Sequence, residues 1–401
     1  MIAAWERDYI RLGFRIEKHF PGYVDAYSGP PELKTEVEAE GVTAPADLVR
    51  AAAALQDRLG ALPLAADRQN YLAKQVHGVE FQCRKLAGER FSLIEEAQAF
   101  YDITPTVTPE SRFEEGLRLL DDALPGDGAL ADRLAAYRSR RELPKEHAHR
   151  LGALAQQTLL EVRRRSAAIW SIPEDESVEL KIVANKPWGG YNWYLGDCRS
   201  LVEINEDVPM NLHYLVEMVA HEAYPGHHLE KILKDATWYR EHGHLDLTIF
   251  LYNTPQCVIA EGIATSAAGQ IFAPGELDHF VQSQLYPQVG MTDDGVDGAQ
   301  VQAGLDLLAH VDGNAAFLLL DEGRPADEVA AYIARYKQLP IERAQRSIGF
   351  MRSYGSYIFT YTYGKQLMAP LLQGTDRHQV FHKLLVDYVT PSDLVAWAAS
   401  R

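Results

Sequence analysis

The chain has 401 residues, of which 56 are Asp or Glu and 39 are Lys or Arg, so its formal net charge is −17. This balance argues against a nucleic-acid partner, because phosphate binding needs clustered basic residues. No apolar run approaches the length that crosses a bilayer, and residues 1–20 have the pattern of an amphipathic helix and not of a signal peptide. Three scattered cysteines fit free thiols in a reducing compartment, so we expect a cytoplasmic protein with no membrane partner.

The first 170 residues are predicted to be a series of helices. Apolar residues recur there at helical spacing, and Pro-Gly turn signals separate the segments. The predicted helices are residues 3–20, 46–62, 68–87, 110–124 and 147–169. We therefore treat residues 1–170 as an N-terminal helical part.

The composition shifts after residue 170. Residues 178–184 (VELKIVA) and 200–205 (SLVEIN) alternate apolar and polar positions, which predicts strands, and residues 188–196 (WGGYNWYLG) suggest a third. From residue 210 onward the pattern is helical again. No repeat or linker separates the parts, so residues 171–401 are expected to be the zinc-binding catalytic part of one compact body.

A histidine–glutamate pair ends one predicted apolar helix. Within residues 216–234 (VEMVAHEAYPGHHLEKILK), the apolar stripe runs directly into His221 and Glu222. Zinc peptidases begin their active sites in this way, because the imidazole can bind the metal while the next carboxylate takes a proton from water. A structural pair held by hydrogen bonds is the ordinary alternative. We expect His221 to bind zinc and Glu222 to be the catalytic base.

The second histidine does not occupy its usual place. The short H-E-x-x-H pattern would put it at residue 225, which is proline, and histidines follow at His227 and His228. Proline and glycine at 225–226 should break or bulge the helix. Looping out two residues cuts the mismatch between the flanking apolar stripes from about 110° to about 45° and places His227 one turn after His221. In an unbroken helix His228 would share the face of His221, about 10 Å along the axis. We predict His227 as the ligand, with His228 as the alternative ligand or as a substrate contact.

A third ligand is expected from another helix. Residues 258–272 (VIAEGIATSAAGQIF) are helical in pattern and rich in small residues, and Glu261 lies in their first turn. Small residues would let this helix approach the His-Glu helix closely. Two histidines and one glutamate form a catalytic zinc site that keeps one position open for water.

The segment HEAYPGHH, followed forty residues later by AEGIA, resembles a bacterial family of zinc metallopeptidase-like proteins catalogued as domain of unknown function 885. The family pattern is H-E-x-x-P-G-H-H with a downstream E-G-W-A, and this chain has Ile263 at the tryptophan position. Residues 21–33 (PGYVDAYSGPPEL) and 360–365 (TYTYGK) resemble its terminal segments. The family is related to the gluzincin peptidases, whose third ligand is a glutamate. The resemblance therefore implies Glu261 as that ligand.

Three tyrosines near the C-terminus, Tyr354, Tyr357 and Tyr361, recur at helical spacing and could form either a core stripe or part of the site. Tyr361 holds the tyrosine place of the family's Tyr-x-x-Gly, so we expect its phenol to donate a hydrogen bond to the substrate oxyanion. Tyr357 is expected to contact substrate. Arg352 could bind a substrate carboxylate or form a surface salt bridge. Strand 200–205 could be a sheet edge that pairs with an extended peptide, or an ordinary strand.

These patterns predict a mainly α, gluzincin-like helical metallopeptidase body with a small antiparallel sheet next to the zinc helix. The predicted function is zinc-dependent cleavage of amide bonds in short peptides by activated water. One alternative is a zinc amidohydrolase or esterase of a non-peptide metabolite. Another is a non-catalytic metal-binding protein, although structural zinc sites usually have four ligands, often thiolates, and residues 221–228 contain no cysteine.

Overall fold

Amphipathic helices build the N-terminal part in the computed structural model, which describes residues 1–186 and 188–401. The five predicted helices are confirmed within a few residues at each end. Three short helices of nine to eleven residues were not predicted, because so few turns show little apolar periodicity. The eight helices are α1 (Ile2–Glu17), α2 (Pro31–Ala39), α3 (Pro45–Leu59), α4 (Ala66–Leu86), α5 (Leu93–Tyr101), α6 (Glu110–Ala123), α7 (Leu130–Arg140) and α8 (Leu151–Ala167).

The three predicted strands form one sheet, β2 (Ser177–Val183), β3 (Gly190–Gly196) and β4 (Arg199–Asn205), in the order β2-β4-β3. Strands β3 and β4 are antiparallel, but β2 pairs with β4 in parallel, so the predicted all-antiparallel sheet was wrong. The most buried strand, β4, fills the space between the other two. The suggestion that residues 200–205 form a free edge was also wrong, because the free edge beside the candidate site belongs to β3.

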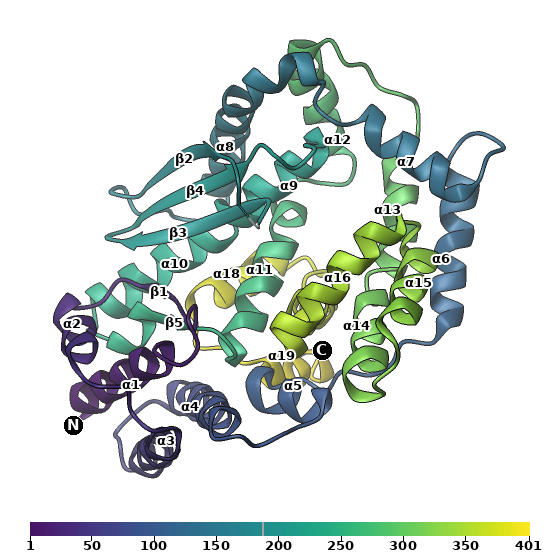
Figure 1. The fold of residues 1–401 in the computed structure, drawn as a ribbon. Coiled ribbons are helices and arrows are strands. Elements are labelled where there is room, and N and C mark those ends of the chain that lie inside the picture. Colours follow the sequence, from purple (N-terminus) through teal and green to yellow (C-terminus); the bar gives the residue numbers. More distant parts are fainter. Residues whose placement is uncertain (187) are drawn as a thin grey trace.

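A second sheet joins the N-terminal part to the middle of the chain. Strand β1 (Val24–Tyr27) pairs antiparallel with β5 (Ile249–Leu251), and Val24 lies opposite Leu251. With four and three residues, these strands are too short to show an alternating pattern in the sequence. This pairing places residues of the N-terminal part beside the segment that leads into helix α11 (Pro255–Ile271) (Figure 1).

Helices make up most of the remaining chain, so the mainly α fold is confirmed. Figure 1 shows the three-stranded sheet beside α8 and α9, while α6 and α13 to α15 lie on the other side of the molecule. The helices are α9 (Leu212–Glu222), α10 (His227–Lys234), α11 (Pro255–Ile271), α12 (Glu276–Phe280), α13 (Gly298–Leu307), α14 (Val311–Ala316), α15 (Ala326–Lys337), α16 (Ile341–Tyr354), α17 (Phe359–Met368), α18 (Arg377–Val386) and α19 (Pro391–Ala399).

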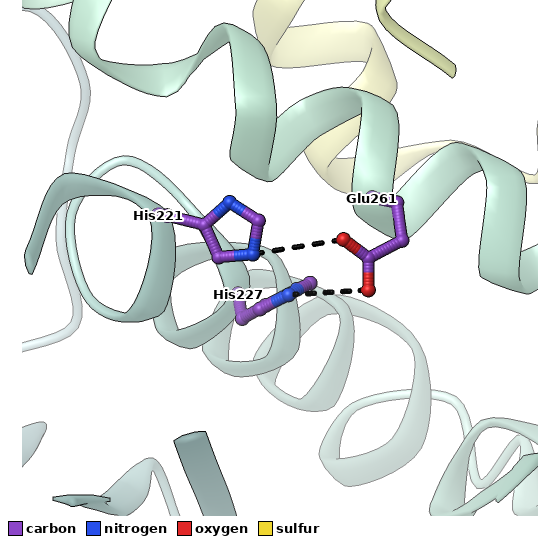
Figure 2. A group of neighbouring side chains, drawn as sticks. All are labelled: His221, His227 and Glu261. Atoms are coloured by element: carbon purple, nitrogen blue, oxygen red, sulfur yellow. Dashed lines mark ion pairs between the residues drawn. The ribbon is translucent and has the colours of Figure 1, made fainter. Parts of the chain in front are cut away.

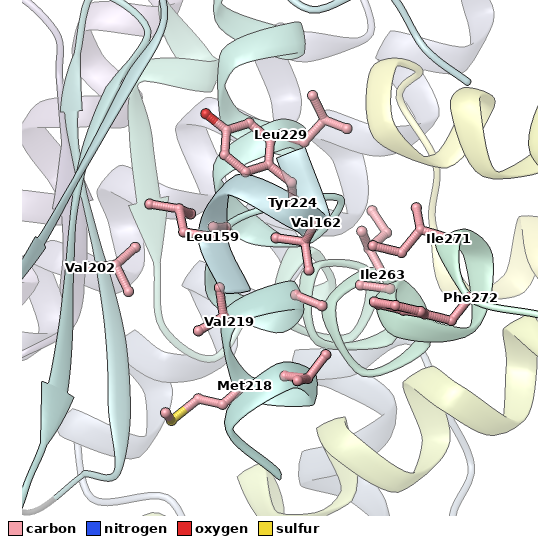
Figure 3. Packing of buried hydrophobic residues seen from close by; sticks show 14 of the residues in the cluster. Leu159, Val162, Val202, Met218, Val219, Tyr224, Leu229, Ile263, Ile271 and Phe272 are labelled. Carbon is pink, nitrogen blue, oxygen red and sulfur yellow. The ribbon is translucent and has the colours of Figure 1, made fainter. Parts of the chain in front are cut away.

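One hydrophobic core holds α9 in place. Val219 of α9 is buried in the same cluster as Val162 of α8, Val202 of β4 and Ile263 of α11 (Figure 3). Each fully buried side chain of this size contributes about 1.5–3 kcal/mol relative to an exposed one. Helix α9 is therefore fixed from several sides, which sets the position of the polar residues at its C-terminal end.

Residues 298–321 form, within the described part of the chain, one helical run that is long and apolar enough by composition to cross a membrane. The sequence pattern predicts no run of this length. Val301, Leu308 and Val311 of this run are buried in a cluster with Phe113 and Leu120 of α6. The run thus packs as a core helix, which makes it weak support for a membrane span.

Candidate metal centre

The predicted helix break is confirmed between α9, which ends at Glu222, and α10, which begins at His227. The N–H of Gly226 donates to the carbonyl of Ala220 at 3.0 Å. A Cβ atom at Gly226 would lie 1.9 Å from the carbonyl oxygen of His221, so only glycine fits this close turn. The turn brings the rings of His221 and His227 to 4.7 Å between centroids, at 89° to each other.

Glu261 completes a three-residue cluster from the second turn of α11. Its Oε2 lies 3.6 Å from Nε2 of His221, and its Oε1 lies 4.0 Å from Nε2 of His227. The three potential ligand atoms all lie within 4.8 Å of one another. Figure 2 shows both histidine rings turned toward the carboxylate. The structure thus brings together the three residues that were predicted to bind metal.

The electrostatics of this cluster suit a bound cation. Burial, followed by the neighbouring His227, lowers the pKa of His221 well below its usual value, and burial lowers the pKa of His227 to about 3. Both imidazoles are therefore neutral at pH 7, and a ring nitrogen of each can act as a ligand. Oε2 of Glu261 is buried without a hydrogen-bond partner in the described part of the chain.

A zinc ion fits these residues. Tetrahedral zinc, with bonds of about 2.0–2.2 Å, holds its ligand atoms roughly 3.4 Å apart, close to the 3.6 Å between His221 and Glu261. Two imidazole nitrogens and one carboxylate oxygen are also a donor set that zinc prefers. The orphaned oxygen of Glu261 would gain the partner that it lacks.

Two glycines let α17 approach α11 and bring the C-terminal tyrosines to Glu261. A Cβ atom at Gly364 would lie 2.6 Å from the carbonyl oxygen of Val258, and one at Gly262 would lie 2.9 Å from the Gly364 carbonyl group. The backbones therefore touch at these positions. This close contact explains why glycine stands at both positions, in the Glu-Gly segment and in the Tyr-x-x-Gly segment.

Both tyrosines face the cluster. The phenol of Tyr357 donates to Oε1 of Glu261 at 3.4 Å, and the ring of Tyr361 lies 5.8 Å from that of Tyr357. Tyr361 is 41% exposed, so its side chain remains open to a ligand. The charge of Glu261, followed by burial, raises the pKa of Tyr361 well above its usual value. The phenol therefore stays protonated and can donate a hydrogen bond.

Glu222 lies at the end of α9 under the edge strand β3. Burial, followed by the charge of Asp25, raises its pKa to about 8. Nδ2 of Asn192 donates to the Glu222 carbonyl oxygen at 2.7 Å, and a Cβ atom at Gly190 would lie 3.4 Å from its Oε1. Neither Gly190 nor Asn192 was predicted from the sequence as a site residue. The signal was a glycine pair inside a strand-like segment, which marks a close backbone approach.

Asp25 of β1 is a further carboxylate, which was not predicted from the sequence as a site residue. The phenol of Tyr191 donates a hydrogen bond to it. The charge of Asp25 contributes to the raised pKa of both Glu222 and Glu261, so it lies near these carboxylates, although Asp25 itself is exposed. The sequence signal for Asp25 was its place in the segment 21–33 that resembles the family.

Two predicted site residues lie elsewhere. His228 is fully buried, with Nδ1 2.8 Å from Oγ of Ser200 and Nε2 3.0 Å from Oε2 of Glu176. Both of its ring nitrogens are thus engaged away from the cluster, and it has no exposed surface for a substrate. Arg352 is exposed on α16, and no contact within the described part of the chain joins it to the cluster.

Comparisons with known proteins show the fold. The “putative lipoprotein” from Colwellia psychrerythraea has a similar structure, with a TM-score of 0.53 and 15% identity, over 88% of this chain and 67% of that chain. The M32 carboxypeptidase from Deinococcus radiodurans R1 gives a TM-score of 0.41 at 11% identity, over 100% of this chain and 95% of that one, which is too distant to carry an argument. No family model and no curated protein matches the chain. Membership in the family that the motifs resemble stays a prediction.

Proposed function

We propose that this protein is a zinc-dependent hydrolase that cleaves amide bonds in short peptides. The observation that carries the proposal is the cluster of two neutral imidazoles and a buried carboxylate, whose Oε2 lacks a partner and lies 3.6 Å from His221. The proposal is also supported by the resemblance of HEAYPGHH to metallopeptidase-like proteins. It assigns the metal to His221, His227 and Glu261.

The bound metal would supply Lewis-acid activation of water and of the substrate carbonyl. Glu222 accepts the proton that the attacking water loses and gives it to the nitrogen of the leaving amine as the C–N bond breaks. Burial raises the pKa of Glu222 to about 8, and a bound cation would lower it again, so that the carboxylate would be ionised and able to accept the proton. Tyr361 donates a hydrogen bond to the oxyanion that forms on the substrate, and Tyr357 holds Glu261 in place.

A cavity lies beside α9 and α11, and none of His221, Glu222, His227 and Glu261 lines it. Its volume is about 1100 Å³, and it is lined by Tyr214 and Glu217 of α9 and by Ala268 of α11. Glu217 lies one helical turn before His221 on the same helix. Ligand cavities are typically about 300–1,000 Å³, so this one can hold a short peptide. The cavity therefore lies at the N-terminal half of α9, away from the candidate ligand at the C-terminal end of that helix.

The test combines metal content with hydrolysis. We expect one zinc ion per chain by elemental analysis, and cleavage of short peptides that a chelator abolishes and added zinc restores. The panel contains peptides with free and blocked ends, a non-peptide amide and an ester. Peptide cleavage that persists in metal-free protein would refute the zinc mechanism. Cleavage of the amide or ester but of no peptide would favour a metabolite hydrolase instead.

A further inference from the structure

The two adjacent histidines of the Pro-Gly-His-His segment face opposite environments. His227 faces Glu261 and His221, whereas His228 points into the core and bonds to Glu176 and Ser200. Glu176 lies just before β2, and Ser200 lies on β4. The second histidine thus links the metal-site turn to the sheet, although it takes no part in the cluster itself.

Glu176 is the centre of this network. Its Oε2 accepts hydrogen bonds from Nε2 of His228 and from the phenol of Tyr224, while its Oε1 accepts from Nε of Arg163 at 2.7 Å. The Glu176 side chain is 1% exposed. Burial opposes its ionisation, but the hydrogen bonds from His228, Tyr224 and Arg163 keep its pKa below the usual value. The carboxylate is therefore ionised at neutral pH and holds three donors in fixed directions.

The network fixes both ends of the turn that carries the ligand. Tyr224 and His228 flank residues 225–227, and their rings lie 4.9 Å apart at 76°. Both are bound to the same oxygen of Glu176. His227 lies inside this five-residue segment. A displacement of Glu176 would free both ends of the segment, and His227 would move relative to His221 and Glu261.

We propose that Glu176 is a positioning residue of the metal centre, which anchors Tyr224 and His228 and so holds His227 at ligand distance from His221 and Glu261. The inference rests on the proposed metal site. It gives the second histidine of the segment a role as an anchor. It also accounts for a buried carboxylate that stability alone does not require, since apolar side chains of similar size often replace buried ion pairs without loss of stability.

The experiment uses Co²⁺ in place of zinc, because its visible absorption reports the coordination geometry. Glu176→Gln keeps the size of the side chain but cannot accept from three donors. We expect its Co²⁺ spectrum to change, and its metal dissociation constant, measured by competition with a chelator, to rise about 10- to 100-fold. Tyr224→Phe removes one hydroxyl group from a side chain that is 1% exposed, and should change both quantities in the same direction to a smaller extent.

The matched control is Glu6→Gln, which removes another buried carboxylate that pairs with an arginine, in the N-terminal part. It should leave the Co²⁺ spectrum and the metal affinity unchanged, even if it lowers stability. If Glu176→Gln does not fold, Tyr224→Phe decides the question alone. Wild-type spectra and affinities in the folded variants would overturn the positioning role. A wild-type protein that binds no Co²⁺ and no zinc would instead overturn the metal site and this inference with it.

Discussion

Two buried clusters of ionisable groups differ in whether a positively charged side chain pairs with their carboxylates. In the first cluster, the guanidinium of Arg68 in the N-terminal part forms ion pairs with Glu6 of the same part and with Asp246, and all three side chains are 6% exposed or less. In the other cluster, Glu261 meets two imidazoles that are neutral at pH 7, and no Lys or Arg pairs with it in the described part of the chain.

The difference separates a structural cluster from a candidate binding site. Arg68 supplies one positive charge to Glu6 and Asp246, and the raised pKa of Glu6 lets a proton balance the second carboxylate, although Oδ2 of Asp246 has no hydrogen-bond partner in the described part of the chain. The cluster around Glu261 consists of groups that can donate electron pairs, and its charge can be balanced only by a proton or by a bound cation. Burial of charge alone is therefore a poor sign of function. A buried carboxylate that lacks a Lys or Arg partner is a better sign of a binding site.

The largest expected effect is that of Glu222→Gln, which separates catalysis from metal binding. The substitution removes the proton acceptor but no predicted ligand, so kcat should fall by about 10²- to 10⁴-fold while metal content stays at one per chain. Glu217→Gln, one turn earlier on the same helix, is the control and should retain most of its turnover. Wild-type kcat in Glu222→Gln would show that another group takes the proton.

The second prediction tests the first cluster, which consists of Arg68, Glu6 and Asp246. Arg68→Met leaves Glu6 and Asp246 buried without a cation, so the free energy of unfolding should fall by about 3–5 kcal/mol. Urea denaturation measures this loss. Metal content per folded chain should not change, because this cluster and the candidate metal centre share no residue. A loss of metal at full stability would mean that the two clusters are coupled.

Tyr361→Phe should produce a smaller effect, on catalysis alone. Loss of one oxyanion donor lowers kcat by about 10²- to 10³-fold. The ring remains, and the hydroxyl belongs to a side chain that is 41% exposed, so the melting temperature should barely move. An unchanged kcat with a lower melting temperature would return Tyr361 to a packing role.

Local sequence signals predicted the parts of the site that depend on local geometry. The break at residues 225–226 followed from proline and glycine chemistry, and the shifted apolar stripe favoured His227. The choice between His227 and His228 could not be settled from the segment itself. What draws His228 into the core is Glu176 and Ser200, which lie 52 and 28 residues away in the sequence.

Long-range pairing limited the prediction of the sheets in the same way. The alternating pattern of residues 200–205 identifies a strand, but it does not show that β4 lies between β2 and β3. The approach of α17 to α11 also needs two glycines, Gly262 and Gly364, that are far apart in the chain. The small residues of 258–272 predicted a close contact with the His-Glu helix. Helix α11 does pack against α9, and it also approaches α17, which was not predicted from the sequence.

The last prediction is a pH dependence that measures how completely the charges of Arg68, Glu6 and Asp246 cancel. Burial, and to a smaller extent the charge of Asp246, raises the pKa of Glu6 to about 7, although Arg68 lowers it in part. The ordinary value is 4.5. Between these values the folded chain binds more protons at Glu6 than the unfolded chain does. The contribution of Glu6 to the free energy of unfolding should therefore fall as the pH rises from about 4.5 to 7, and it should be constant above that.

Glu6→Gln isolates this contribution, because glutamine does not titrate. The free energy of unfolding of the wild type minus that of the variant, from urea titrations at several pH values, should decrease across this window. A difference that rises with pH would mean that Arg68 lowers the pKa of Glu6 more than burial raises it. In that case both carboxylates would be ionised beside a single guanidinium, and the first cluster would carry a net negative charge. A missing cation would then no longer distinguish the cluster around Glu261, and the contrast between the two clusters would rest on geometry alone.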